Sequence, residues 1–189
     1  MSTRVPEMNY RLRTATVADA PALNGLIARS IRELGSKDYT ADQIEAALKG
    51  AFGLDSTLIR DETYYVVLAG SEGIVGCGGW SRRRTLFGSD SNSDRDDAWL
   101  DPQTDRAKIR AFFIDPAHSR RGLGRMLLQQ CESSAQRAGF RRFELMATIP
   151  GRRLYEACGY VAGPALEHPL QGGLRITFIP MTKDPNPIA

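Results

Sequence analysis

The sequence has few cysteines, few histidines and no apolar run long enough to span a bilayer. Its three cysteines, Cys77, Cys131 and Cys158, are far apart and match neither a zinc spacing nor a disulfide framework. We interpret them as small core residues, and we expect no metal and a reducing cytoplasmic location. Residues 1–6 lack the apolar segment of a signal peptide, so we expect no membrane partner.

The sequence also lacks a large excess of charge of either sign, since its formal net charge is only +3. A nucleic-acid partner is therefore not expected. The hydrophobic fraction of 42% is that of an ordinary globular protein. At 189 residues we predict a single domain over residues 8–183, with a disordered tail at 1–7 and a C-terminal tail at 184–189.

Residue patterns in the first half predict alternating strands and helices. Apolar spacing and capping residues predict a helix after Asp19 and another from Thr40 to Gly50. Strands are expected at 10–15, 64–69 and 74–80, the last two as a hairpin. Residues 84–105 are rich in Asp, Ser and Arg and are predicted to form a long loop.

The second half continues the alternation, which indicates a mixed α/β sheet flanked by helices. Strands are expected at 107–114, 143–147 and 174–179, and helices at 123–138 and 152–158. Gly139 and Gly159 follow the two helices, as glycine often does at a helix C-terminus.

Residues 115–128 join a predicted strand to a predicted helix through a loop that contains Gly122 and Gly124. The first turn of a helix presents unpaired N–H groups and a positive dipole end, which suit an anion such as pyrophosphate. Arg120, Arg121 and Arg125 cluster there, at a cost of ~0.3–1 kcal/mol each unless an anion binds. The alternative is that the arginines point into water and the glycines serve only the turn.

Two common nucleotide motifs are excluded by particular residues. A P-loop requires Lys and Ser/Thr after its glycine, and neither follows Gly124. A dinucleotide fingerprint requires a third glycine near position 127, which is Leu127.

Two segments resemble motifs of the GNAT acetyltransferases. Pro116 and Arg121-Gly122-Leu123-Gly124 fit motif A, whereas Ser119 and Arg120 replace the family's Gln/Arg and first glycine. Leu154-Tyr155 and Gly159-Tyr160 match motif B in order and spacing, with Pro150-Gly151 where the family often has Asn-Ala. The order and separation of the two segments make the resemblance specific.

The resemblance implies a GNAT-like fold, namely a mixed, mostly antiparallel sheet of about six to seven strands flanked by about four helices. It implies an N-acetyltransferase in which acetyl-CoA lies between splayed strands at 107–114 and 143–148. Tyr155 corresponds to the general acid that protonates the departing thiolate. The residues implied to bind acetyl-CoA are Phe112, Phe113, Ile114, Arg120, Arg121, Gly122, Leu123, Gly124 and Arg125.

The implied acceptor is a small-molecule amine or a peptide amine, and homodimers are common in the family. A base must neutralise the amine, and Glu144 and Glu33 are candidates, although each is also explained as a structural carboxylate. His118 and His168 are interpreted as loop residues. The Asp residues of 84–105 either belong to a solvated loop or attract a cationic acceptor.

Two alternatives to an enzyme remain open from the sequence. One is a non-catalytic acyl-CoA-binding or sensing module with the same fold. The other is a structural protein in which the loop of residues 115–125, here named the Gly-Arg loop, binds a different anion or none.

Overall fold

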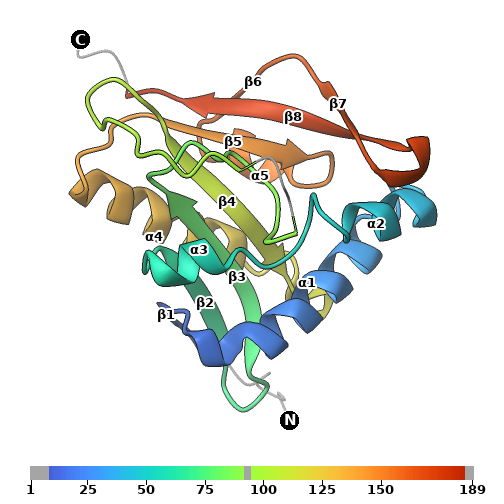
Figure 1. Cartoon of the computed structure of the whole chain (residues 1–189). Coiled ribbons are helices and arrows are strands. Elements are labelled where there is room, and N and C mark those ends of the chain that lie inside the picture. Colours follow the sequence, from blue (N-terminus) through green and yellow to red (C-terminus); the bar gives the residue numbers. More distant parts are fainter. Residues whose placement is uncertain (1–8, 92–94, 186–189) are drawn as a thin grey trace.

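An eight-stranded sheet forms the centre of the part described by this computed structural model, residues 9–91 and 95–185 (Figure 1). The strand order is β1-β2-β3-β4-β5-β8-β6, with β7 also paired to β8. Only β4 and β5 are parallel among these strands. The strands are β1 (Tyr10–Thr14), β2 (Tyr64–Ala69), β3 (Ile74–Ser81), β4 (Ala107–Ile114), β5 (Phe143–Thr148), β6 (Val161–Ala162), β7 (Leu166–Pro169) and β8 (Arg175–Lys183).

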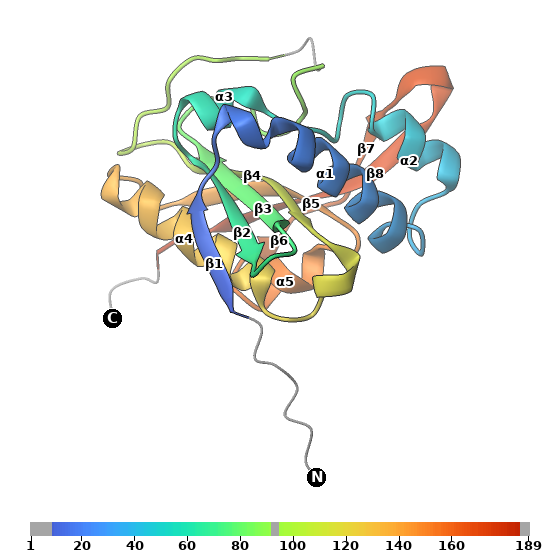
Figure 2. The same cartoon turned by 90° about the horizontal axis from the view of Figure 1, so that it is seen from below.

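Helices cover both faces of this sheet (Figure 2). On one face, α1 (Ala20–Leu34), α2 (Ala41–Ala47) and α3 (Ser56–Arg60) enclose a core cluster with the inward side chains of β2, β3 and β4. On the other face, α4 (Leu123–Arg137) and α5 (Arg152–Glu156) enclose a second cluster. The apolar stripe of α4, which includes Leu127 and Cys131, is fully buried there.

The predicted fold class is confirmed, and the described residues contain two strands and one α-helix that the residue patterns did not predict. The additional elements α3, β6 and β7 are only five, two and four residues long, too short for a periodic pattern to emerge. The prediction that His168 is a loop residue is wrong, because it lies in β7 opposite Ile176. The predicted tails lie largely outside the described residues, although Asp184 forms an ion pair with Arg106.

A β-bulge bends β4 at the point where the site forms. Cys77 faces Phe113 and Gly79 faces Arg110, so Gly78 alone opposes Ala111 and Phe112. Ala111 has a left-handed backbone (φ 56°), and its carbonyl accepts a hydrogen bond from the Tyr64 hydroxyl at 3.1 Å. Any side chain at position 78 would meet the Phe112 ring at 2.8 Å, which explains the glycine.

β4 and β5 are paired before the bulge in β4, and they separate after it. Their ladder contains only residues 107–109 of β4 and 143–145 of β5. Both strands continue beyond it, to Ile114 and Thr148 respectively. The two strands therefore splay apart, as the resemblance implied.

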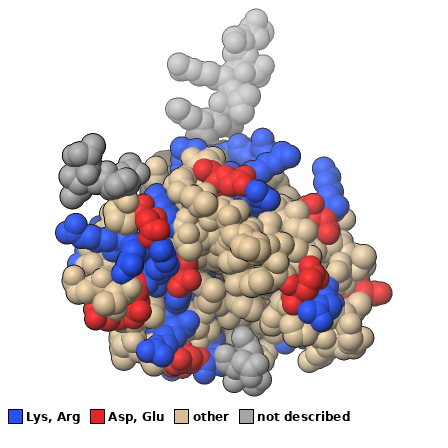
Figure 3. All heavy atoms as spheres, turned by 90° about the horizontal axis from the view of Figure 1, so that it is seen from above, with Lys and Arg blue, Asp and Glu red and all other residues tan. Residues whose placement is uncertain are grey.

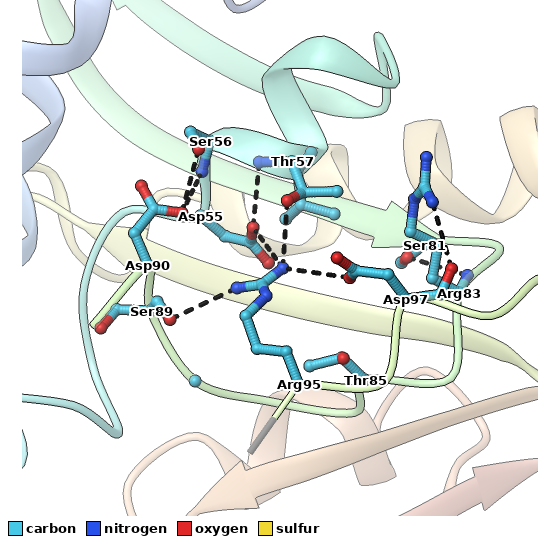
Figure 4. A network of polar contacts seen from close by, with 12 residues as sticks. Asp55, Ser56, Thr57, Ser81, Arg83, Thr85, Ser89, Asp90, Arg95 and Asp97 are labelled. Atoms are coloured by element: carbon cyan, nitrogen blue, oxygen red, sulfur yellow. Dashed lines mark hydrogen bonds and ion pairs between the residues drawn. The ribbon is translucent and has the colours of Figure 1, made fainter. Parts of the chain in front are cut away.

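Polar contacts fasten the predicted loop to the body of the protein (Figure 4). The Asp55 carboxylate caps α3 through the Thr57 N–H and also faces two arginines, Arg95 at 3.0 Å and Arg110 at 2.7 Å. Asp90 accepts hydrogen bonds from the backbone and hydroxyl of Ser56. The loop is thus anchored at several points along its length.

The buried Asp55 carboxylate should contribute strongly to stability. We expect Asp55→Asn to lower the free energy of unfolding by about 3–5 kcal/mol, because it leaves Arg110 buried without its counter-charge. Urea denaturation measures this change. As a control, Glu45→Gln removes an ion pair with Arg32 whose side chains are each 53% exposed, and should change the free energy of unfolding only slightly. Similar losses in both variants would contradict the role assigned to Asp55.

Candidate active site

A cavity of about 390 Å³ opens beside the splayed ends of β4 and β5. Residues from α1, the bulged half of β4, the Gly-Arg loop and α5 line it, and most of its surface is apolar. The lining residues used below are Ser30, Tyr39, Phe112, Phe113, Ile114, Ser119, Arg120, Gly124, Thr148 and Tyr155. A mainly apolar cavity of this size suits a ligand with apolar parts and a few polar groups.

A second, smaller cavity of about 80 Å³ lies nearer α2 and the loop after β3. Phe87 and Gly88 from that loop, Arg110 from β4 and Met146 from β5 contribute to its wall. The residues that line both cavities are Phe52, Phe112, Phe113, Thr148 and Tyr155. The two spaces therefore meet at the splayed strands.

The Gly-Arg loop has the strained backbone expected of a ligand-binding turn. Arg120 and Gly122 both have left-handed backbones, with φ values of 62° and 82°. For arginine this conformation is uncommon and costs energy, and such strain collects at functional sites. Among the described residues no side chain caps α4, so its first N–H groups remain available to a ligand.

The six residues of this loop that were predicted to bind acetyl-CoA lie in three different environments. Arg120 and Gly124 line the larger cavity. Arg121, Gly122 and Arg125 are exposed beside it, and the Leu123 side chain is buried in the core. For all six residues, contact with a ligand stays a prediction.

The three predicted strand residues, Phe112, Phe113 and Ile114, all line the larger cavity. The Ile114 N–H already donates to the Ser30 hydroxyl at 3.2 Å, so a ligand there would have to compete with Ser30. Backbone groups nearer the bulge do not face this competition from Ser30.

Tyr155 stands at the boundary of the two cavities and is only 8% exposed. Its ring packs edge-on against Phe112 and Tyr160, with centroids 6.1 Å and 5.9 Å away. Burial raises the pKa of its hydroxyl well above the usual range, with smaller contributions from Cys131 and Cys158. Tyr155 is therefore protonated at any physiological pH.

Neither carboxylate considered as a base lines a cavity. Glu144 forms an ion pair with Lys108, its partner across the β4–β5 ladder, and Glu33 lies exposed on α1. No Asp, Glu or His is found among the residues that line the two cavities. Both carboxylates are thus better explained as structural or solvated.

His118, interpreted from the sequence as a loop residue, lies in the connection between β4 and α4 and is buried. It lies in a short 3-10 turn, is 3% exposed and is held between the Tyr10 hydroxyl at 3.0 Å and Glu72 at 3.1 Å. These contacts attach the start of the Gly-Arg loop to β1 and the β2–β3 turn.

The Asp residues of the loop are mostly engaged with nearby groups. Asp96, Asp101 and Asp105 accept hydrogen bonds from backbone N–H groups within the loop. Such bonds are typical of aspartates that shape turns. Asp94 lies outside the described residues. In Figure 3, acidic and basic side chains are interspersed on the face shown, without a single acidic field.

Sequence reasoning missed four side chains of the site: Ser30, Tyr39, Thr148 and Arg110. Ser30 and Tyr39 come from α1 and the segment after it, and no local motif marks them. Arg110 had a visible signal, since it is a cation inside the otherwise apolar run Ile109 to Ile114.

No group of three or more His, Cys, Asp or Glu side chains in the described part of the chain could hold a metal ion. No helix there has the length and apolar character needed to cross a bilayer.

Comparison with known proteins gives a family match over most of the chain. Residues 28–160 match the model of the acetyltransferase (GNAT) family. No curated protein sequence matches significantly.

Solved structures with the same fold include a GCN5-related N-acetyltransferase from Rhodopseudomonas palustris (20% identity, TM-score 0.67, 94% of this chain and 98% of that one). Another is the PaiA N-acetyltransferase of Thermoplasma acidophilum in complex with coenzyme A (13%, 0.62, 94% and 100%). A third is the ribosomal-protein-S18-alanine N-acetyltransferase of Escherichia coli (16%, 0.56, 96% and 96%). At these identities, the likeness establishes the fold.

Gly122 should be required for its backbone conformation and not for space. Nothing lies within 4 Å of a side chain added there, but its φ of +82° disfavours any residue with a Cβ. We expect Gly122→Ala to lower the free energy of unfolding by about 1–2 kcal/mol in urea denaturation. Gly50→Ala, which also has open space and no positive φ, is the control and should change stability little. Equal effects would show that the left-handed turn is not the reason for Gly122.

Proposed function

Because the chain belongs to the GNAT family of acetyltransferases, we propose that it transfers an acetyl group from acetyl-CoA to a primary amine by direct attack. One observation carries the proposal, namely that Tyr155 lies where the two cavities meet. The larger cavity would hold the donor and the smaller one the acceptor. An acid at the boundary can then reach both reacting partners.

The residues of the larger cavity fit the chemistry of acetyl-CoA. Its apolar walls, with Phe112 and Leu154, suit a pantetheine chain. The uncapped start of α4 and the adjacent Arg120, Arg121 and Arg125 suit a pyrophosphate. Acetyl-CoA itself supplies the activated acetyl group, as a thioester.

Tyr155 would move a proton between the two partners. An amine that becomes an amide loses a proton, and a departing thiolate gains one. Because burial disfavours the phenolate of Tyr155, any proton it donates to sulfur must be replaced promptly by one from the amine side. Because Tyr155 lines both cavities, it can pass a proton from the amine to the thiolate.

The acceptor would have to be neutral when it attacks. Since no carboxylate or imidazole lines either cavity, its proton would leave to bulk water or through a water chain. A small-molecule amine or a peptide amine remains the proposed acceptor class, and the cytoplasm the proposed location.

Tyr155→Phe tests the proposed acid. Loss of the hydroxyl should lower kcat for amine acetylation by about 10²-fold or more, while the KM for acetyl-CoA changes little. Free thiol release from acetyl-CoA measures turnover. Tyr160→Phe is the matched control, because its hydroxyl binds Glu132 at 2.9 Å and lines neither cavity. Wild-type kcat in Tyr155→Phe would exclude the assigned role.

The same assay separates an enzyme from a sensing module. If the wild-type protein binds coenzyme A but turns over no amine in a broad panel, the non-catalytic alternative is correct.

The pH dependence of kcat/KM should be set by the pKa of the acceptor amine and not by a group of the protein. We expect kcat/KM to rise with pH until the amine is neutral, because no group in the cavity walls titrates between pH 5 and 9. For two acceptors whose amine pKa values differ by about two units, the midpoints should differ by the same amount. A common midpoint near pH 6–7 for both acceptors would instead reveal a base on the protein.

A further inference from the structure

Arg110 is a buried cation in the wall of the smaller cavity. It lies in β4 between Ile109 and Ala111, and its side chain is 2% exposed. A buried guanidinium is costly unless its charge is balanced and its N–H groups have partners. Neither condition is fully met.

The hydrogen bonds of Arg110 are incomplete. Its Nη2 donates to the Gly88 carbonyl at 3.0 Å and lies 2.7 Å from Asp55 Oδ2. Its Nε is buried and has no hydrogen-bond partner among the described residues. A buried N–H group without an acceptor destabilises the protein, and an acceptor supplied by a ligand would remove this cost.

The charge of Arg110 is also only partly balanced. Asp55, its counter-ion, is shared with Arg95, whose Nη2 lies 3.0 Å from Asp55 Oδ1. Asp97 lies 3.8 Å from Arg95, but its side chain is 53% exposed and therefore screened by water. Burial lowers the pKa of Arg110, Asp55 opposes this effect and Arg95 adds to it. Two guanidinium groups therefore share the Asp55 carboxylate beside the cavity.

Apart from Arg110, Thr148 and Tyr155, the wall consists of apolar side chains and glycines. Phe52, Phe87, Phe178 and Met146 contribute to it, and none of its lining residues is acidic. The cavity measures about 80 Å³, which limits it to a small ligand.

We propose that the smaller cavity takes an acceptor with a carboxylate near its amine and a short apolar side chain, that is, a small apolar amino acid. Arg110 binds the carboxylate, and the aromatic wall receives the side chain. This inference rests on the proposed acetyltransferase activity and narrows its acceptor. It also disfavours a polycation, which would bring positive charge against Arg110.

The first test compares matched acceptors that differ only in the carboxylate. L-leucine and L-valine are compared with L-leucinamide and L-valinamide, and spermidine serves as the cationic arm. With rates expressed per neutral amine, kcat/KM should be about 10- to 100-fold higher for each acid than for its amide. Equal rates, or a preference for the amides or spermidine, would overturn the inference while leaving the proposed activity intact.

The second test assigns the preference to Arg110. In Arg110→Gln the acid-to-amide ratio should fall to about one, whereas a purely structural defect would lower both rates together and preserve the ratio. Arg83→Gln is the control, because Arg83 pairs with Asp61 at 2.7 Å and does not line the cavity. Its ratio should match the wild type. An unchanged ratio in a folded Arg110→Gln variant would exclude Arg110 as the carboxylate partner.

A third measurement needs neither turnover nor a folded variant. Calorimetry on the wild-type protein should show tighter binding of N-acetyl-L-leucine than of N-acetyl-L-leucinamide by about tenfold or more. Equal binding would count against the inference. No turnover of any amine would count instead against the proposed function, which keeps the two failures distinct.

Discussion

The structure depends on one backbone feature, the bulge that turns β4 away from β5. Parallel strands that stayed paired along their full length would leave no space between them. Here the ladder ends after Ile109, and the left-handed Ala111 is held by the Tyr64 hydroxyl. Phe112, placed by that bulge against Gly78, becomes part of the wall of both cavities.

Contacts between distant parts of the chain hold the rims of the two cavities in place. The Tyr39 hydroxyl donates to the Thr177 carbonyl and accepts from the Ile149 N–H, each at 2.9 Å. It thereby joins the segment after α1 to the end of β5 and to β8. Since Tyr39 is only 6% exposed, these bonds fix the far rim of the larger cavity. The Asp55 cluster does the same for the smaller one.

The sequence predicts the long elements and the Gly-Arg turn because their signals are local. Capping by Thr40, the stripe of α4 and the Gly122 turn are each encoded within a few residues. It does not predict β6, β7 or the placement of His118, which depend on pairing with distant strands. Ser30 was missed for the same reason, since only the folded chain brings it to a cavity wall. Arg110 stood out as a cation in an apolar strand, but its place at a cavity also depends on the fold. The proposed acceptor site could therefore not be inferred from motifs.

A crystal structure with bound coenzyme A tests the central claim most directly. The account predicts that the pantetheine chain lies between the splayed ends of β4 and β5, with the sulfur near Tyr155 and the pyrophosphate against the backbone of residues 120–125. Coenzyme A bound elsewhere on the molecule, or β4 and β5 paired along their full length, would contradict it.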